Sequence, residues 1–281
     1  MLVEELLFKP KHGLVDQSLH SRMGVETTNG DGFGLGWYGQ GGGPGVYHGV
    51  APAWGDDNLR ELAGHISSPL FLAHVRAAIG SPVQQTNCHP FREGNWLFVH
   101  NGYIENFHDI RRSLSLAIEP SRYPNIHGST DTEVVFQLAL TFGLEEDPIG
   151  ALEQTVGLIE STAGENGARG EVQASFGVSD GETLWAVRYA TKGKARSLFA
   201  SSDIESVKRL HPDNERLKRL SNDDRLIVSE PFADLPGLWN EIPQSSAVTV
   251  RHGGFYEPRA FEPRPPGGRP AVRQYAGAGD A

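Results

Sequence analysis

The sequence predicts an α+β fold in which helices are layered on stacked antiparallel sheets. The first half of the chain mixes short strands with helices, and the part after Gly164 is rich in strands. The dipeptide Asp180-Gly181 between two apolar runs indicates a hairpin turn. Strands that are gathered together, rather than alternating with helices, favour antiparallel sheets over a doubly wound parallel sheet.

The period of the apolar residues predicts each element. Helices are expected where apolar side chains recur at helical spacing, and strands where short apolar runs are bounded by polar or turn residues. The expected helices are one capped within Asp56-Asp57-Asn58 that ends before Pro69, and those over 103–118, 132–142 and 148–161. The expected strands cover 70–75, 96–99, 172–178, 183–189, 197–200, 225–229 and 246–251.

A glycine-rich segment precedes the first of these helices. Gly34, Gly36 and Gly39 nominally spell a dinucleotide-binding fingerprint, but the glycines and proline at 41–44 cannot form the helix that would hold a pyrophosphate. Glycines at every second position predict instead a strand with one face that another backbone approaches closely.

Composition limits the classes of function. The 281 residues are 38% hydrophobic and carry a net charge of −10 with no long basic run, so a globular protein is expected and nucleic acid is not an expected partner. A single cysteine excludes an intrachain disulfide framework and indicates a reducing compartment. We find neither a signal-peptide core nor a membrane-length apolar run, so the expected location is the cytoplasm, away from membranes. The histidines do not fall at zinc spacings, and no metal or other cofactor is expected.

The chain is expected to form one domain. Residues 1–257 contain no linker or internal repeat, whereas residues 258–281 are rich in proline and glycine without an apolar period. The second segment is therefore predicted to be a disordered tail.

Three polar features lie where an expected strand ends or an expected helix begins. Arg76 is either a solvated charge or a group that holds a carboxylate through two parallel hydrogen bonds. Asn101-Gly102 is either a simple turn or a pair of donors that stabilises an oxyanion. Asp131 is either a helix cap or a ligand for an ammonium group.

His89 and Cys88 form a second candidate pair. His89 is expected to orient a loop or to form a pocket wall. Cys88 is its neighbour, and neighbours on an extended chain point to opposite faces, so the two are a poor nucleophile and base. Cys88 is therefore expected to be a small buried side chain.

Four motifs, taken together and in this order, resemble the class II glutamine amidotransferase domain. They are His-Val-Arg-Ala-Ala at 74–78, Asn-Cys-His-Pro-Phe at 87–91, His-Asn-Gly-Tyr-Ile-Glu-Asn at 100–106 and Ser-Thr-Asp-Thr-Glu-Val at 129–134. The resemblance, to the stand-alone, single-domain branch, covers most of residues 3–245. It implies the N-terminal nucleophile hydrolase fold, a four-layer αββα sandwich of two antiparallel sheets.

The resemblance also implies roles for the matching residues. Arg76 would bind the α-carboxylate of glutamine and Asp131 its α-ammonium group. Asn101 and the N–H of Gly102 would form the oxyanion hole, and His89 would shape the pocket. The implied substrate is glutamine or a γ-glutamyl compound, and any ammonia acceptor would be bound by a separate synthase subunit, unless the protein is a plain hydrolase.

The sequence departs from the family at the nucleophile. Family members use the thiol of an N-terminal cysteine with its α-amino group as base, whereas this sequence begins Met1-Leu2-Val3. About ten residues, a strand and a short connection, are expected to be missing. Two explanations stay open, a start assigned too late or a glutamine-binding relative without catalysis that senses glutamine or acts as a scaffold. The chain as given is predicted to be inactive, and a chain with a restored N-terminus to be an amidohydrolase.

Overall fold

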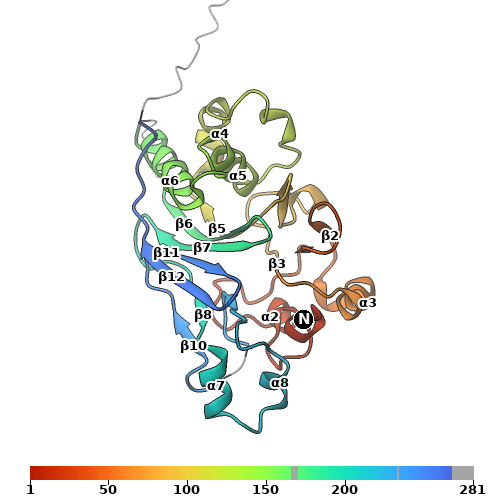
Figure 1. Ribbon diagram of the computed structural model, residues 1–281. Helices are drawn as coiled ribbons and strands as arrows, with labels where there is room; N and C mark the ends of the chain where they lie inside the picture. The colour runs from red at the N-terminus through yellow and green to blue at the C-terminus, as the bar shows by residue number, and fades with distance from the viewer. Residues whose placement is uncertain (166–169, 233, 268–281) are drawn as a thin grey trace, which may run out of the picture.

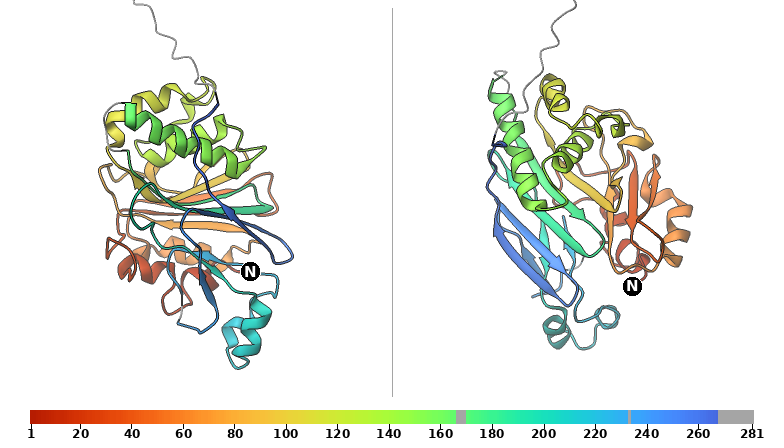
Figure 2. Two further views of the ribbon diagram at one scale, coloured as in Figure 1. Left: turned by 90° about the vertical axis from the view of Figure 1, so that its left-hand side faces the viewer. Right: turned by 45° about the horizontal axis from the view of Figure 1, so that its top comes forward.

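The structure is a computed structural model that describes residues 1–165, 170–232 and 234–267. Antiparallel sheets are stacked between two layers of helices, and the left view of Figure 2 shows these layers edge-on. This arrangement confirms the α+β sandwich of antiparallel sheets and helical layers that the sequence predicts.

The larger sheet contains six strands in the order β12-β11-β7-β6-β5-β4. These strands are β4 (Phe91–Glu93), β5 (Trp96–Ile104), β6 (Val172–Ser179), β7 (Thr183–Ala190), β11 (Ser246–Arg251) and β12 (Phe255–Ala260). Three helices cover one face of this sheet (Figure 1): α4 (Phe107–Leu116), α5 (Asp131–Thr141) and α6 (Pro148–Glu165). The rings of Phe98 and Phe136 stack at this face with their centroids 5.2 Å apart. Buried apolar side chains thus join the helices to the sheet.

The smaller sheet has the order β2-β1-β3 and belongs to the first part of the chain. Its strands are β1 (Phe33–Trp37), β2 (Gly45–Gly49) and β3 (Phe71–Val75). The helices α1 (Glu4–Leu7), α2 (Leu14–Leu19) and α3 (Asp57–His65) pack against it and share a second core with β1. The short 3-10 helices are η1 (Ala53–Gly55), η2 (Gln85–Asn87) and η3 (Tyr123–Asn125).

A third sheet, in the order β10-β8-β9, lies at the lower end of the molecule in Figure 1. It consists of β8 (Phe199–Ser201), β9 (Ile227–Val228) and β10 (Trp239–Glu241). The helices α7 (Ile204–Leu210) and α8 (Glu215–Lys218) follow β8 and enclose a small core of their own.

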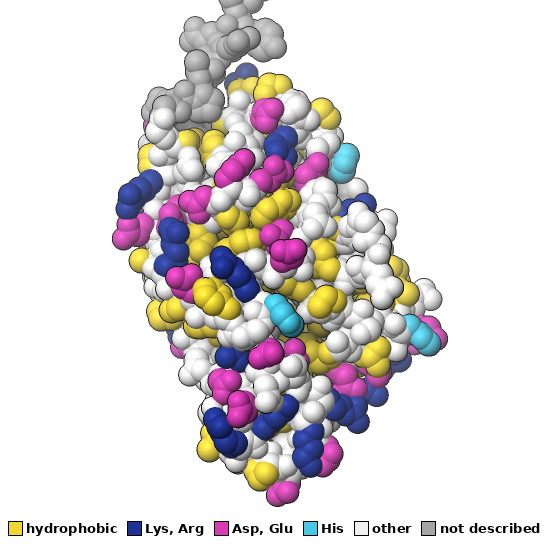
Figure 3. Space-filling model, viewed as in Figure 1, with side chains coloured by type: hydrophobic (Ala, Val, Ile, Leu, Met, Phe, Trp, Pro, Cys, Tyr) yellow, Lys and Arg dark blue, Asp and Glu magenta, His cyan; other side chains and the backbone are white. Residues whose placement is uncertain are grey.

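The face drawn in Figure 3 carries acidic and basic side chains interspersed with apolar ones. Mixed signs of charge produce no large field of one sign on this face. Among the described residues, no helix has both the length and the apolar content that crossing a membrane requires.

Several local predictions are confirmed. The side chain of Asp56 accepts a hydrogen bond from the N–H of Leu59 and caps α3. Asp180 and Gly181 connect β6 to β7, and Gly181 has the positive φ of 101° that this turn requires. A Cβ on Gly34 would lie 2.0 Å from the carbonyl oxygen of His89, so a neighbouring backbone does approach the glycine strand.

The prediction that a helix covers 103–118 is wrong at its start. Strand β5 continues to Ile104, and α4 begins only at Phe107. Asn101 and Gly102 therefore lie inside a strand and do not form a turn after it. The reason is that β5 pairs with β6 throughout this stretch, and sheet pairing with a distant segment overrides the local apolar period.

The predicted tail does not begin at residue 258. Residues 258–260 belong to β12, which pairs with β11, and Phe261 is buried against Tyr189. The N–H of Arg264 then donates to the carbonyl oxygen of Glu153. Backbone pairing and one buried aromatic side chain thus hold a proline-containing segment against the sheet. Residues 268–281 of the predicted tail lie outside the described residues.

Candidate active site

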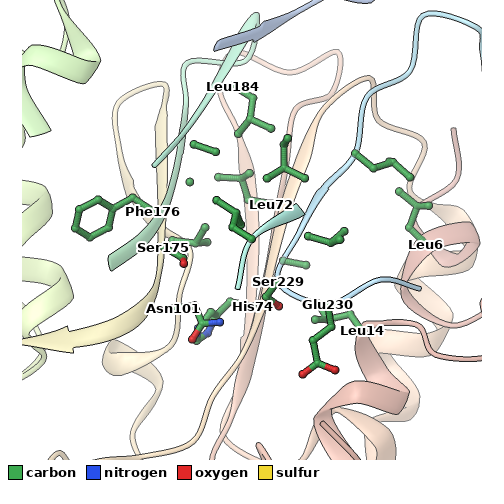
Figure 4. A pocket seen from close by; sticks show the side chains of 18 of the residues that line it. Leu6, Leu14, Leu72, His74, Asn101, Ser175, Phe176, Leu184, Ser229 and Glu230 are labelled. Atoms are coloured by element: carbon green, nitrogen blue, oxygen red, sulfur yellow. The ribbon is translucent and has the colours of Figure 1, made fainter. Parts of the chain in front are cut away.

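A cavity of about 1140 Å³ lies between the stacked sheets (Figure 4). Apolar side chains line much of it, among them Leu6, Leu72 and Leu184. Asn101 and Ser175 of the larger sheet also line the cavity, near the end occupied by His74 in Figure 4. A largely apolar cavity with a few polar groups gathered at one end is typical of a small-molecule site.

Strand β3 forms one wall of the cavity. All five of its residues line the cavity, and it pairs with β1 through one edge only. Within the described residues no strand pairs with its second edge. The backbone groups on that edge can therefore accept a further strand.

Asn101 reaches the cavity because of the alternation of side chains along β5. Val99, Asn101 and Tyr103 line the cavity, whereas His100 faces α5. Asn101 lies opposite Ser175 on β6, whose buried hydroxyl has no hydrogen-bond partner within the described part of the chain. The strand thus presents an amide to the cavity beside an unsatisfied hydroxyl.

Gly102 is required by close packing behind this wall. A Cβ at this position would lie 1.8 Å from the carbonyl oxygen of Gln173 and 2.4 Å from Nε2 of His100. Any other residue would force β5 and β6 apart. Gly102 itself does not line the cavity.

Two buried histidines, His89 and His100, and the half-buried His74 lie beside the polar end of the cavity. The rings of His74 and His89 are stacked with centroids 4.3 Å apart, and Nδ1 of His89 accepts a hydrogen bond from the N–H of His100 at 3.4 Å. Burial lowers the pKa of all three, and the pKa of His74 falls to about 3, with further contributions from His100 and Arg76. The histidines are therefore neutral near pH 7. No three His, Cys, Asp or Glu side chains among the described residues are grouped to hold a metal ion.

Arg76 is buried immediately beyond β3, with 4% of its surface exposed. Its guanidinium group donates to the carbonyl oxygens of Asp31 and Pro82 and to the hydroxyl of Ser81, at 3.3, 3.3 and 2.6 Å. All three acceptors are uncharged. Within the described residues Arg76 forms no ion pair, so a buried positive charge is left without a counter-charge.

Asp131 joins α5 to β5. Its carboxylate accepts hydrogen bonds from the N–H of Ile104 at 2.8 Å and from the N–H and hydroxyl of Thr132 at 2.7 and 3.2 Å. The helix cap itself is Thr130, whose hydroxyl accepts from the N–H of Glu133. Asp131 is half-buried and retains acceptor capacity, because each carboxylate oxygen has two lone pairs.

The structure brings some of the predicted site residues to the cavity and leaves others behind its wall. Asn101 lines the cavity, whereas Arg76, His89, Gly102 and Asp131 do not. The histidines lie between these groups, since His100 contacts both His89 and Thr132, the neighbour of Asp131. His89 and Asp131 are thus connected through His100 and Thr132 behind Asn101, whereas Arg76 lies two residues beyond His74 with its own set of acceptors.

Cys88 is buried, as predicted, and does not line the cavity. It is 1% exposed, and its thiol lies 3.4 Å from the carbonyl oxygen of Gly49. Burial raises the pKa of the thiol, which disfavours the reactive thiolate.

The sequence did not predict several other residues that line the cavity. Arg196 lies between β7 and β8, forms an ion pair with Glu26 at 3.4 Å and lies near the ring of Tyr103. Gln173 on β6 also lines the cavity. Tyr103 lies within a motif used above, but no motif marks Glu26 or Arg196 as cavity residues, because they meet across 170 residues of sequence.

Comparison with known proteins places this geometry in a family. The family model described as "Glutamine amidotransferases class-II" matches residues 14–258. The chain is 34% identical to the probable glutamine amidotransferase DUG3 of Saccharomyces cerevisiae, over 89% of this chain and 78% of the relative. It is 29% identical to the gamma-glutamyl-hercynylcysteine sulfoxide hydrolase of Mycolicibacterium smegmatis, over 88% of this chain and 89% of the relative. A solved glutamine aminotransferase class-II domain protein from Silicibacter pomeroyi has a TM-score of 0.66 and 33% identity, covering 82% of this chain and 91% of that one.

Proposed function

Because the chain belongs to the class II glutamine amidotransferase family, we propose that it binds glutamine or a γ-glutamyl amide and acts in hydrolysis of the γ-amide bond. The observation that carries the proposal is Arg76, a buried cation that has no acidic partner within the described residues. An uncompensated buried charge is costly, and the α-carboxylate of a γ-glutamyl ligand would compensate it.

The other site residues complete the recognition of the glutamyl group. Asp131, whose carboxylate keeps acceptor capacity, binds the α-ammonium group. The side chain of Asn101 and the N–H of Gly102 stabilise the oxyanion that forms on the γ-carbonyl group. His89, neutral and packed against His74, shapes the glutamyl pocket from behind.

We assign the nucleophile to the thiol of an N-terminal cysteine that heads a strand paired with β3. The free edge of β3 and the apolar cavity beside it support this assignment, because an added strand would find there both backbone partners and an apolar environment. The buried position of Cys88 outside the cavity lining also supports it. Among the described residues there is no other thiol.

The reaction then follows in two steps. The thiolate attacks the γ-carbonyl carbon, the C–N bond breaks, and the leaving amine takes the proton that the α-amino group removed from the thiol. Water, deprotonated by the same α-amino group, attacks the thioester and releases glutamate and the thiol. With glutamine the leaving amine is ammonia, which a separate synthase subunit could consume.

The second candidate is a catalytically inactive protein that binds glutamine for sensing or as a scaffold. The two candidates share the glutamyl pocket and differ in turnover.

The experiment is to produce the chain preceded by the residues that the gene encodes directly before Met1. We expect release of ammonia from glutamine or of glutamate from γ-glutamyl amides. The activity should disappear when the added cysteine is changed to alanine and persist in Cys88→Ala. An in-frame stop directly before Met1, or an extended protein that binds glutamine without turnover, supports the inactive candidate instead.

A further inference from the structure

We propose that Arg196, Tyr103 and Gln173 form a subsite that binds the leaving group of a γ-glutamyl substrate through a carboxylate on that group. The inference rests on the proposed function, since it concerns the part of the same substrate beyond the scissile amide. It names the substrate class as γ-glutamyl amino acids or short γ-glutamyl peptides with a free carboxylate.

Arg196 lies near the polar end of the cavity. Its guanidinium carbon is 5.9 Å from the ring centroid of Tyr103, and Tyr103 follows Asn101 by two residues on the same face of β5. The charge of Arg196 also acts on the histidines His74 and His100, where it adds to the lowering of the pKa that burial causes. A cation thus lies one side chain further along the cavity than the proposed oxyanion site.

The guanidinium group of Arg196 has N–H donors that are not used by other residues of the described chain. Nη1 of Arg196 lies 3.4 Å from one carboxylate oxygen of Glu26, and within the described residues Nε and Nη2 have no hydrogen-bond acceptor. The side chain of Arg196 is only 15% exposed, and Arg196 lines the cavity. A carboxylate could bind to them in the bidentate manner that guanidinium groups favour.

Gln173 supplies an unsatisfied acceptor beside the cation. Its Oε1 is buried and has no hydrogen-bond partner within the described part of the chain, and Gln173 pairs with Tyr103 across β5 and β6. Buried acceptors without a donor are rare because they lose the hydration that they had in water. An N–H on the ligand would satisfy this oxygen.

Arg196 and Gln173 match the two polar groups of an amino acid that is joined through its nitrogen to the γ-carbonyl group. An amino acid or a short peptide attached to the γ-carbonyl group has an N–H for Gln173 and a carboxylate for Arg196. The ammonia that glutamine releases has no carboxylate, so it gains nothing from Arg196. The subsite therefore favours a γ-glutamyl amino acid or peptide over glutamine.

Binding to the protein that carries the residues encoded before Met1, with its N-terminal cysteine changed to alanine so that no turnover occurs, tests this inference. Isothermal titration calorimetry compares γ-glutamylglycine with its C-terminal amide and with glutamine. We expect γ-glutamylglycine to bind at least about tenfold more tightly than its amide, as a charge-assisted pair would allow. Arg196→Met should abolish this difference and change glutamine affinity by less than twofold. Arg22→Met is the matched control, because Arg22 also lines the cavity but is 57% exposed, and it should keep the difference.

Glu26→Gln gives a second test that retains Arg196. Removal of the competing carboxylate should increase the affinity for γ-glutamylglycine and leave that for its amide unchanged. Equal affinities of acid and amide in the unaltered chain overturn the subsite while glutamine binding still supports the glutamyl pocket. If none of the three ligands binds, both the subsite and the proposed function fail.

Discussion

Nδ1 of His100 lies 3.1 Å from the hydroxyl oxygen of Thr132, which joins β5 to the first turn of α5 directly behind Asn101. Nε2 of His100 also lies 2.9 Å from the carbonyl oxygen of Gln173 on β6. One neutral imidazole thus links both neighbours of the strand that carries the proposed oxyanion donor. The buried histidines therefore connect stability to the geometry of the site.

This cluster predicts that stability falls in mild acid. Burial lowers the pKa of His74 to about 3, so the unfolded chain binds protons first as the pH falls through about 6.5. The free energy of unfolding should then decrease between pH 6.5 and pH 3, by up to about 1.4 kcal/mol per pH unit for each such histidine. Urea denaturation at pH 7, 6 and 5 measures the slope.

His74→Asn should reduce that slope, because one of the depressed groups is removed. His65→Gln is the control, since the side chain of His65 is 76% exposed, and it should leave the slope unchanged. An equal slope in His74→Asn and the unaltered protein would show that His74 titrates normally.

Gly102 should tolerate no side chain. Gly102→Ala places a Cβ 1.8 Å from the carbonyl oxygen of Gln173, and we expect a loss of at least about 2 kcal/mol of stability from the forced shift. Gly64→Ala in α3 is the control, because a Cβ there has no neighbour within 4 Å, and it should stabilise by about 0.5–1 kcal/mol. Thermal unfolding of the two variants should give shifts of opposite sign, and a neutral Gly102→Ala would refute the close packing.

The stacked pair Phe98 and Phe136 should be essential to the larger core. Both side chains are at most 1% exposed, so Phe136→Ala leaves a cavity between α5 and the sheet and should cost about 3–5 kcal/mol. Leu116→Ala, at a side chain 54% exposed on α4, should change stability by less than about 0.5 kcal/mol. Chemical denaturation compares the two, and similar midpoints would contradict the assigned core.

Local signals predicted much of the fold. The hairpin between β6 and β7, the cap at Asp56 and the helices α5 and α6 depend on residues close together in sequence, and the structure confirms them. The helix start after Asn101 was wrong because β6, about 70 residues later, holds that segment in a sheet. The short strands β2, β4, β10 and β12 were missed for the same reason, since their pairing partners define them better than their own sequences.

In the site, too, residues of a local motif were predicted, whereas residues that are brought together from distant parts of the chain were not. Asn101 belongs to a compact motif, and its place on the cavity wall agrees with a role at an oxyanion. Arg196 has no motif of its own, and its neighbours Glu26 and Tyr103 come from other parts of the chain. The unsatisfied Oε1 of Gln173 is likewise a property of the packed structure and cannot be read from one residue type.

Calorimetric titration with L-glutamine measures whether buried Arg76 binds the α-carboxylate of a γ-glutamyl ligand. Arg92→Met is the control, because Arg92 is exposed and donates to the carbonyl oxygen of Pro44, and this variant should bind glutamine as the unaltered chain does. We predict that Arg76→Met binds glutamine at least about 30-fold more weakly than the unaltered chain does. Glutamine α-amide, which lacks the carboxylate, should bind weakly to Arg76→Met and to the unaltered chain. Equal glutamine affinity in Arg76→Met and the unaltered chain would show that Arg76 does not bind the α-carboxylate.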